Sequence, residues 1–148
     1  MSGETDMIKL YSGRILELAA DIPQTERLVH PTATARRRSP LCGSAVTVDL
    51  LIENDRIIGF GQDVKACALG QAAASVVGRE IVGTTGTQLR AARDQLSAML
   101  KENGSAPDAP FEELKVLLPA REYQNRHASI MLVLDAAVDA FASAEAAA

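Results

Sequence analysis

Residues 45–64 constrain the fold of this chain more than any other segment. Side chains alternate along residues 45–52, with apolar residues at 46, 48, 50 and 52 on one face, as in a half-buried strand. Asn54-Asp55 then supplies a tight turn, and residues 56–64 form the expected return strand, with Ile58 and Phe60 facing inward. The segment therefore predicts an antiparallel β-hairpin.

Segments with helical spacing lie on both sides of this hairpin. Before it, residues 7–20 predict a helix that Pro23 ends, and residues 32–38 predict an edge strand. The apolar face of that first helix is expected to hold Ile8, Tyr11, Ile15 and Leu18. After the hairpin, a helix rich in small residues is expected from Cys67 to about Gly78.

Two longer helices complete the pattern, with a short amphipathic turn or helix at 111–118 between them. The first begins at a cap on Thr84 or Thr87 and ends near Glu102, and the second begins near Asn125. Their buried faces are expected to hold Leu89, Ala92, Leu96 and Leu100 in the first, and Ile130, Leu134, Ala137, Val138 and Phe141 in the second. Residues 143–148 are expected to fray.

The order of these elements predicts one α+β domain spanning residues 1–148. A small antiparallel sheet of about three strands is expected, with helices packed on one face. The net charge of −4 argues against general nucleic-acid binding, which needs a basic surface. The run Arg36-Arg37-Arg38 is either a solvated edge or a docking patch for an acidic partner.

The chain is expected in the cytoplasm. Residues 1–6 are acidic and lack the apolar core of a signal peptide, and no apolar stretch reaches membrane-spanning length. Thiols stay reduced in that compartment, so the two cysteines are expected to be free, metal-binding or catalytic rather than disulfide-bonded.

Cys42 and Cys67 are the first candidates for chemistry. Cys67 opens a predicted helix, whose unpaired N–H groups stabilise a thiolate. Cys42 lies in a turn between Pro40 and Gly43, and pairing of the two hairpin strands would bring both sulfurs to one end of the sheet. The alternatives are a buried core thiol at Cys67 and an ordinary turn residue at Cys42.

A third candidate segment is Arg126-His127-Ala128-Ser129, at the start of the last helix. A site built from Cys42, Cys67 and this segment would suit zinc or an iron–sulfur cluster. The alternative is an ordinary surface or core histidine at His127 and a helix-start hydroxyl at Ser129. The chain has no P-loop, no dinucleotide-binding glycine motif, no nucleophile elbow and no His-Glu-x-x-His pattern, and no enzymatic activity is expected.

Four stretches of the chain form a recognisable set of motifs. They are Leu10-Tyr11-Ser12, Arg38-Ser39-Pro40-Leu41-Cys42-Gly43, residues 61–75 around Cys67, and Arg126-His127-Ala128-Ser129-Ile130-Met131-Leu132. In combination and order, these stretches resemble the U-type iron–sulfur cluster assembly scaffolds, the family of the NifU N-terminal domain, IscU and SufU. The resemblance covers about residues 7–142 and implies an α+β fold similar to those of IscU and SufE.

The resemblance also implies a function. Such scaffolds receive sulfur from a cysteine desulfurase, assemble an iron–sulfur cluster and pass it to acceptor proteins, and some members bind zinc at the same site. The family's three cysteines would fall at Cys42, Cys67 and Ser129, and its aspartate would fall at Ser44. In a second alignment, Ala128 occupies the third cysteine position and His127 the family's histidine position.

This chain therefore departs from the family pattern at Ser44 and Ser129. A serine hydroxyl stays protonated near neutral pH and is a harder, weaker ligand than a thiolate. Three hypotheses follow. The chain is a scaffold that binds iron, a cluster or zinc through Cys42 and Cys67, with help from His127 and with a homodimer supplying four thiolates. Alternatively, it accepts a persulfide and transfers the sulfur, or it is a degenerate paralogue that acts only by binding partners.

Overall fold

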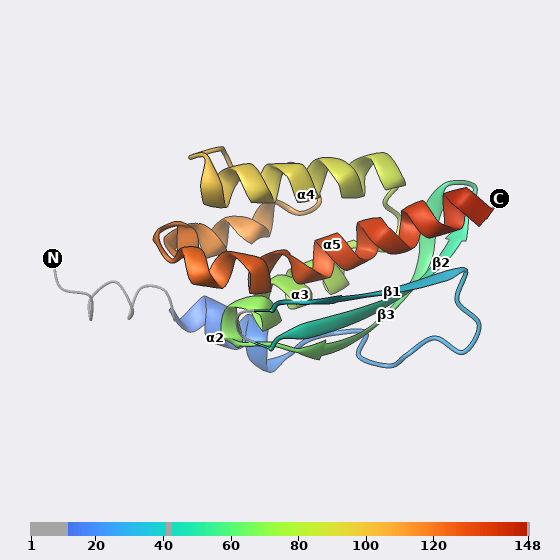
Figure 1. Ribbon diagram of the computed structural model, residues 1–148, viewed down its shortest axis with the longest axis horizontal. Coiled ribbons are helices and arrows are strands. Elements are labelled where there is room, and N and C mark those ends of the chain that lie inside the picture. Colours follow the sequence, from blue (N-terminus) through green and yellow to red (C-terminus); the bar gives the residue numbers. More distant parts are fainter. Residues whose placement is uncertain (1–11, 41–42, 148) are drawn as a thin grey trace, which may run out of the picture.

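The computed structural model describes residues 12–40 and 43–147 (Figure 1). Its elements in chain order are α2 (Gly13–Ala20), β1 (Ala33–Arg38), β2 (Ala45–Glu53), β3 (Arg56–Lys65), α3 (Ala68–Glu80), α4 (Gly86–Lys101), the 3₁₀ helix η1 (Glu112–Glu122) and α5 (Gln124–Ala147). The prediction of an α+β fold with a three-stranded antiparallel sheet is confirmed. Residues 7–11 of the first predicted helix, with Ile8 and Tyr11, lie outside the described residues.

The sheet has the order β1-β2-β3, and the long helix α5 runs along one of its faces (Figure 1). The apolar side chains of β2 that were expected to face inward do so, since Val46, Val48 and Leu50 are buried in the core. Helices α2 and α3 pack together beside α5, and α4 lies on the side of α5 away from the sheet (Figure 1). The predicted covering of one face by helices is therefore correct.

One inward-facing prediction in the hairpin is wrong. Ile58 is 52% exposed, whereas Ile57 is fully buried. The cause is a register shift between Leu51 and Ile52, where Leu51 pairs with Gly59 but Ile52 pairs with Ile57. A bulge of this kind adds one residue to a strand and reverses the alternation beyond it. Phe60 is buried as expected. Two residues earlier, beyond the bulge, Ile58 faces outward instead of lying on the same face as Phe60.

The connection between α2 and β1 covers part of the other face of the sheet. Its anchor is Asp49, a fully buried carboxylate that accepts two hydrogen bonds from Arg27, one from the Leu28 backbone N–H and one from the Thr34 hydroxyl. Gly61 leaves room for this segment, because a Cβ there would lie 2.4 Å from a backbone carbonyl oxygen of the connection. The helices are thus free to pack on the opposite face.

The start of α4 differs from the sequence prediction. Helix α4 is capped by Thr85 rather than Thr84 or Thr87, because Thr85 and Gln88 form a reciprocal capping box. Thr84 instead donates its hydroxyl proton to the Ile81 carbonyl. Residues 143–147, for which fraying was expected, continue α5 as a helix to Ala147, and the expectation of fraying stays a prediction.

Helix α5 is buried over more of its circumference than one apolar stripe predicts. Its expected core residues are buried, and Met131, Leu132 and Val133 are buried as well. The reason is its position, with the sheet on one side and α3 and α4 on others (Figure 1). In the part of the chain that the structure describes, no helix is long and apolar enough to cross a membrane.

A candidate thiol site at the start of α3

Cys67 is the N-cap residue of α3. Its backbone is extended, with φ −68° and ψ 171°, and the helix begins at Ala68. β3 ends at Lys65, which pairs with Ala45, so Cys67 follows the sheet edge at which β2 begins. The residue is partly buried and forms no disulfide. The predicted position of Cys67 at a helix start is therefore confirmed.

The environment of Cys67 favours its thiolate form. Burial of the sulfur raises the pKa of Cys67, but this effect is outweighed and the pKa lies below its usual value. The Ser129 hydroxyl stabilises the thiolate most, and the backbone N–H groups of Gly70 and Leu69 and the charge of Arg126 add to its effect. Stabilisation by N–H groups in the first turn of a helix is what the sequence position predicts.

Ser129 and Ser44 extend this site into the protein interior. The Ser129 Oγ lies 3.5 Å from the Cys67 Sγ, and the Ser129 hydroxyl donates to the Ser44 Oγ at 3.3 Å. Both serines are almost completely buried, at 1% and 5% exposure. A hydroxyl carries one proton, so deprotonation of Cys67 would turn the Ser129 hydroxyl from Ser44 toward the sulfur. Ser129, one of the two positions at which this chain differs from the family pattern, thus contacts Cys67, and Ser44, the other, contacts Ser129.

Gly70 permits the close contact between α3 and α5 at this site. A Cβ at Gly70 would lie 2.6 Å from the Ser129 Oγ, 3.1 Å from the Ser129 carbonyl oxygen and 2.8 Å from the Ala66 Cβ. Any side chain at this position would therefore push Ser129 away from Cys67. Sequence reasoning noted the run of small residues here but did not connect it to Ser129.

Cys42 lies outside the described residues, but the turn that contains it is defined on both sides. The Ser39 N–H donates to the Ser44 carbonyl at 2.8 Å, and the Gly43 N–H donates to the Ser39 carbonyl at 3.1 Å. Gly43 has φ +72°, a conformation that glycine adopts without strain. The end of this turn therefore reaches the candidate site at Ser44, while the expected approach of Cys42 to Cys67 stays a prediction.

His127 is buried at 4% exposure, and its ring is directed to η1. Its Nε2 lies 2.9 Å from the Ala120 carbonyl oxygen and 3.1 Å from that of Arg121. Carbonyl oxygens only accept, so Nε2 carries a proton and donates to them. The structure brings together Cys67, Ser129 and Ser44, and Nε2 of His127 is not part of that group. A ligand role for His127 stays a prediction.

Arg126 contributes to the electrostatics of the candidate site, although the sequence pattern alone assigned it no role. It occupies the first turn of α5, and its charge lowers the pKa of Cys67. Its position beside His127 in the motif was the available signal. Within residues 12–40 and 43–147, no three His, Cys, Asp or Glu side chains form a group that would hold a metal ion.

Solved structures with this fold include two informative relatives. The chain is 44% identical to a nitrogen-fixing NifU-like protein (N-terminal) from Brucella abortus, with a TM-score of 0.95 over 97% of this chain and 99% of that chain. A candidate iron–sulfur cluster assembly scaffold protein for the SUF system, from Fervidobacterium islandicum AW-1, gives a TM-score of 0.81 at 18% identity, over 90% and 98% of the two chains. A scan of protein-family models and a search of curated proteins found no match.

Proposed function

Because this chain belongs to the NifU-like family of U-type scaffold proteins, we propose that it acts in iron–sulfur cluster assembly as a scaffold rather than as an enzyme. The cluster, or its iron, is the cargo. Cys42 and Cys67 are its proposed protein ligands. The observation that carries the proposal is the position of Cys67 at the start of α3, where the first turn, Ser129 and Arg126 favour a thiolate.

The donor set limits how a cluster would be held. Iron in a [2Fe–2S] cluster is usually held by four thiolates. One copy of this chain offers two, since serine hydroxyls stand at positions 44 and 129. We therefore propose a cluster shared between two copies, with Cys42 and Cys67 from each. In this arrangement Ser129 contributes a hydrogen bond or acts as a weak oxygen ligand. His127 would be a supplementary ligand only if its Nδ1 faced the cargo. Zinc is an alternative metal for the same site.

A second function, sulfur acceptance, is favoured by a specific observation. The described part of the site holds one activated thiol beside two buried hydroxyls. In this reaction the Cys67 thiolate attacks the outer sulfur of a persulfide on a cysteine desulfurase. A new S–S bond forms on Cys67, the S–S bond of the donor breaks, and its electron pair leaves on the donor cysteine as a thiolate. The outer sulfur is transferred without net oxidation, ready for an acceptor protein.

Anaerobic reconstitution tests the scaffold proposal. The full chain is incubated with ferrous iron and sulfide, and visible absorption, Mössbauer spectra and elemental analysis are recorded alongside molecular mass. We expect about two iron atoms and two sulfides per pair of chains, with both signals lost in Cys42→Ser and in Cys67→Ser. A chain that stays colourless and binds neither iron nor zinc would refute the scaffold role.

The sulfur-acceptor function has a separate readout. Incubation with a cysteine desulfurase and isotope-labelled cysteine, followed by mass spectrometry, should add one labelled sulfur to Cys67. Failure of Cys67 and Cys42 to gain sulfur would eliminate this function but leave the reconstitution result standing. If Cys42→Ser/Cys67→Ser supported cluster assembly as well as the unchanged chain, partner binding alone would remain.

A further inference from the structure

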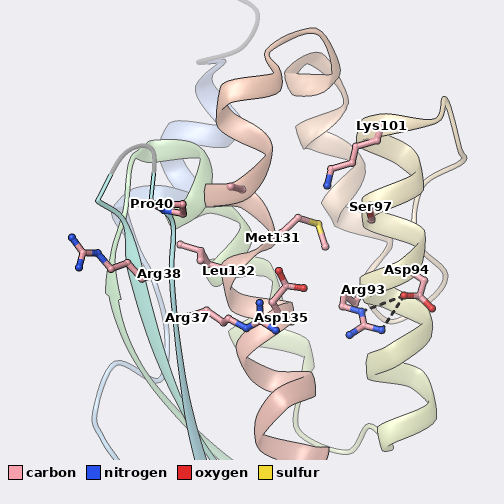
Figure 2. A pocket seen from close by; sticks show the side chains of 11 residues that line it. Arg37, Arg38, Pro40, Arg93, Asp94, Ser97, Lys101, Met131, Leu132 and Asp135 are labelled. Carbon is pink, nitrogen blue, oxygen red and sulfur yellow. Dashed lines mark hydrogen bonds and ion pairs between the residues drawn. The ribbon is translucent and has the colours of Figure 1, made fainter.

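Two neighbouring cavities lie along α4 and α5. The first, of about 490 Å³, is an open cavity lined by residues of β1, α4 and α5 and by Pro40 (Figure 2). The second, of about 380 Å³, lies where α4, η1 and α5 meet. Lys101 and Ala128 line both, so the two cavities meet at these two residues. Figure 2 shows the Lys101 side chain reaching from α4 toward α5.

The second cavity is suited to an anion. It is lined by Leu100, Lys101, Arg121, Gln124, His127 and Ala128, with no carboxylate among them. Lys101 forms no ion pair with any described residue. Arg121 donates to the carbonyl oxygens of Met99 and Gly104, which are neutral, so its charge is also unbalanced and further N–H donors remain.

The first cavity offers an acceptor. Asp135 lines it, and burial raises the pKa of Asp135 although Arg37, Arg93 and Lys101 act in the opposite direction. No described residue donates a hydrogen bond to Asp135, whereas Arg37 pairs with Asp139 and Arg93 pairs with Asp94. The two cavities therefore offer unbalanced positive charge at Lys101, where they meet, and at Arg121 in the second cavity, and a carboxylate acceptor at Asp135 in the first.

The first cavity also includes residues that are close in sequence to the candidate site. Pro40 and Ala128 line it, Pro40 precedes Cys42 by two residues, and Ala128 is adjacent to Ser129. A partner held in this cavity would contact Pro40 and Ala128. The chain as a whole has a net charge of −4, so attraction of an anion here depends on these local groups.

We propose that the two cavities bind an extended acidic segment of a partner protein, with a Glu or Asp carboxylate between Lys101 and Arg121 and backbone N–H groups facing Asp135. The volume of each cavity lies in the range of sites that bind small ligands, so each could hold a few side chains of a peptide. Binding itself does not require the cysteines. That such a partner delivers or receives sulfur at Cys67 rests on the proposed function.

Fluorescence anisotropy with a labelled peptide tests the proposal. The probe is a blocked octapeptide with one central Glu among Gly, Ser and Leu, compared with the same peptide carrying Gln or Lys instead. We expect the Glu peptide to bind the full chain at least about tenfold more tightly than the Gln peptide at low salt, with affinity falling as salt is added. Lys101→Glu should weaken the Glu peptide about tenfold and restore binding of the Lys peptide.

Lys115→Glu is the matched control, since Lys115 is exposed on η1, lines neither cavity and gives the same charge change. Circular dichroism checks that each variant is folded. Equal weakening by Lys101→Glu and Lys115→Glu, equal binding of the Glu and Gln peptides, or binding only of a peptide with a free carboxyl terminus would overturn the proposal. Binding of the Glu peptide that persists in Cys42→Ser/Cys67→Ser would support peptide binding by the two cavities independently of any sulfur chemistry.

Discussion

Ser129→Ala tests whether the buried hydroxyl activates Cys67. The Ser129 Oγ lies 3.5 Å from the sulfur, and its hydrogen bond is the largest influence that lowers the pKa of Cys67. A hydrogen bond to a charged group contributes about 1.5–3 kcal/mol. Because this contact to sulfur is long, we expect it to contribute about 0.75–1.5 kcal/mol. Removing it should therefore reduce the thiolate population about three- to tenfold at a pH below the thiol pKa.

The rate of alkylation by iodoacetamide measures that population. Metal-free protein in a Cys42→Ser background makes Cys67 the only reporter, and the rate is followed as pH rises. The midpoint of the profile should move to higher pH in Ser129→Ala. Ser44→Ala is the control, because Ser44 accepts a hydrogen bond from Ser129 and its substitution leaves the Ser129 hydroxyl in place beside the sulfur. An unchanged midpoint in Ser129→Ala, or an equal shift in Ser44→Ala, would refute the argument.

Three further predictions address the packing and the ligands. Gly70→Ala should lower the free energy of unfolding, measured by urea denaturation, by about 1–3 kcal/mol, because the added Cβ would collide with Ser129. Gly13→Ala is the control, since a Cβ there has nothing within 4 Å and should not lower the stability. Equal effects of the two substitutions would contradict the packing argument. Burial raises the pKa of Asp49, but its hydrogen bonds hold it below the usual value, so the stability that it contributes above the unfolded pKa should be lost as pH falls below about 4. Asp49→Asn should therefore cost about 2 kcal/mol at neutral pH and show a shallower acid dependence in urea unfolding; an unchanged slope would contradict it. Ser129→Cys should raise iron or zinc retention in reconstituted protein at least about tenfold, and equal retention would show that the third position is not a ligand site.

Local periodicity predicted most of the fold because each strand and helix carries a regular apolar face. It failed where distant contacts decide the local structure. Ile57 is buried because its backbone N–H donates to the Thr84 carbonyl and its carbonyl accepts from Gly83, which fixes the bulge that turns Ile58 outward. Likewise, the predicted caps were Thr84 and Thr87, and the actual cap is Thr85, which forms a capping box with Gln88.

The candidate site could be predicted in part. The order of the motifs identified Cys67 and Ser129, and the structure places them in contact. Two contributions were not visible in the sequence because they depend on how α3 and α5 approach each other. Gly70 allows that approach, and Arg126 supplies a charge across it. The second cavity could not be predicted from the sequence either, since Lys101 and Arg121 are twenty residues apart and come together only when α4 packs on η1.

The two serines change how the site should be understood. In a site with three thiols and a carboxylate, each group can bind the metal directly, and the fold needs only to place the four groups close together. Here Ser44 and Ser129 are almost fully buried and hydrogen-bonded to each other, with Cys67 at the more exposed end of the chain of contacts. The Ser129 hydroxyl stabilises the Cys67 thiolate, and both hydroxyls are weaker metal ligands than thiolates. A thiolate at Cys67 therefore does not depend on a third thiol or a carboxylate in the site. The two proposed functions make different demands on this arrangement. A shared cluster predicts a dimer in reconstituted protein, whereas sulfur acceptance requires only one copy, so the oligomeric state of reconstituted protein separates the two.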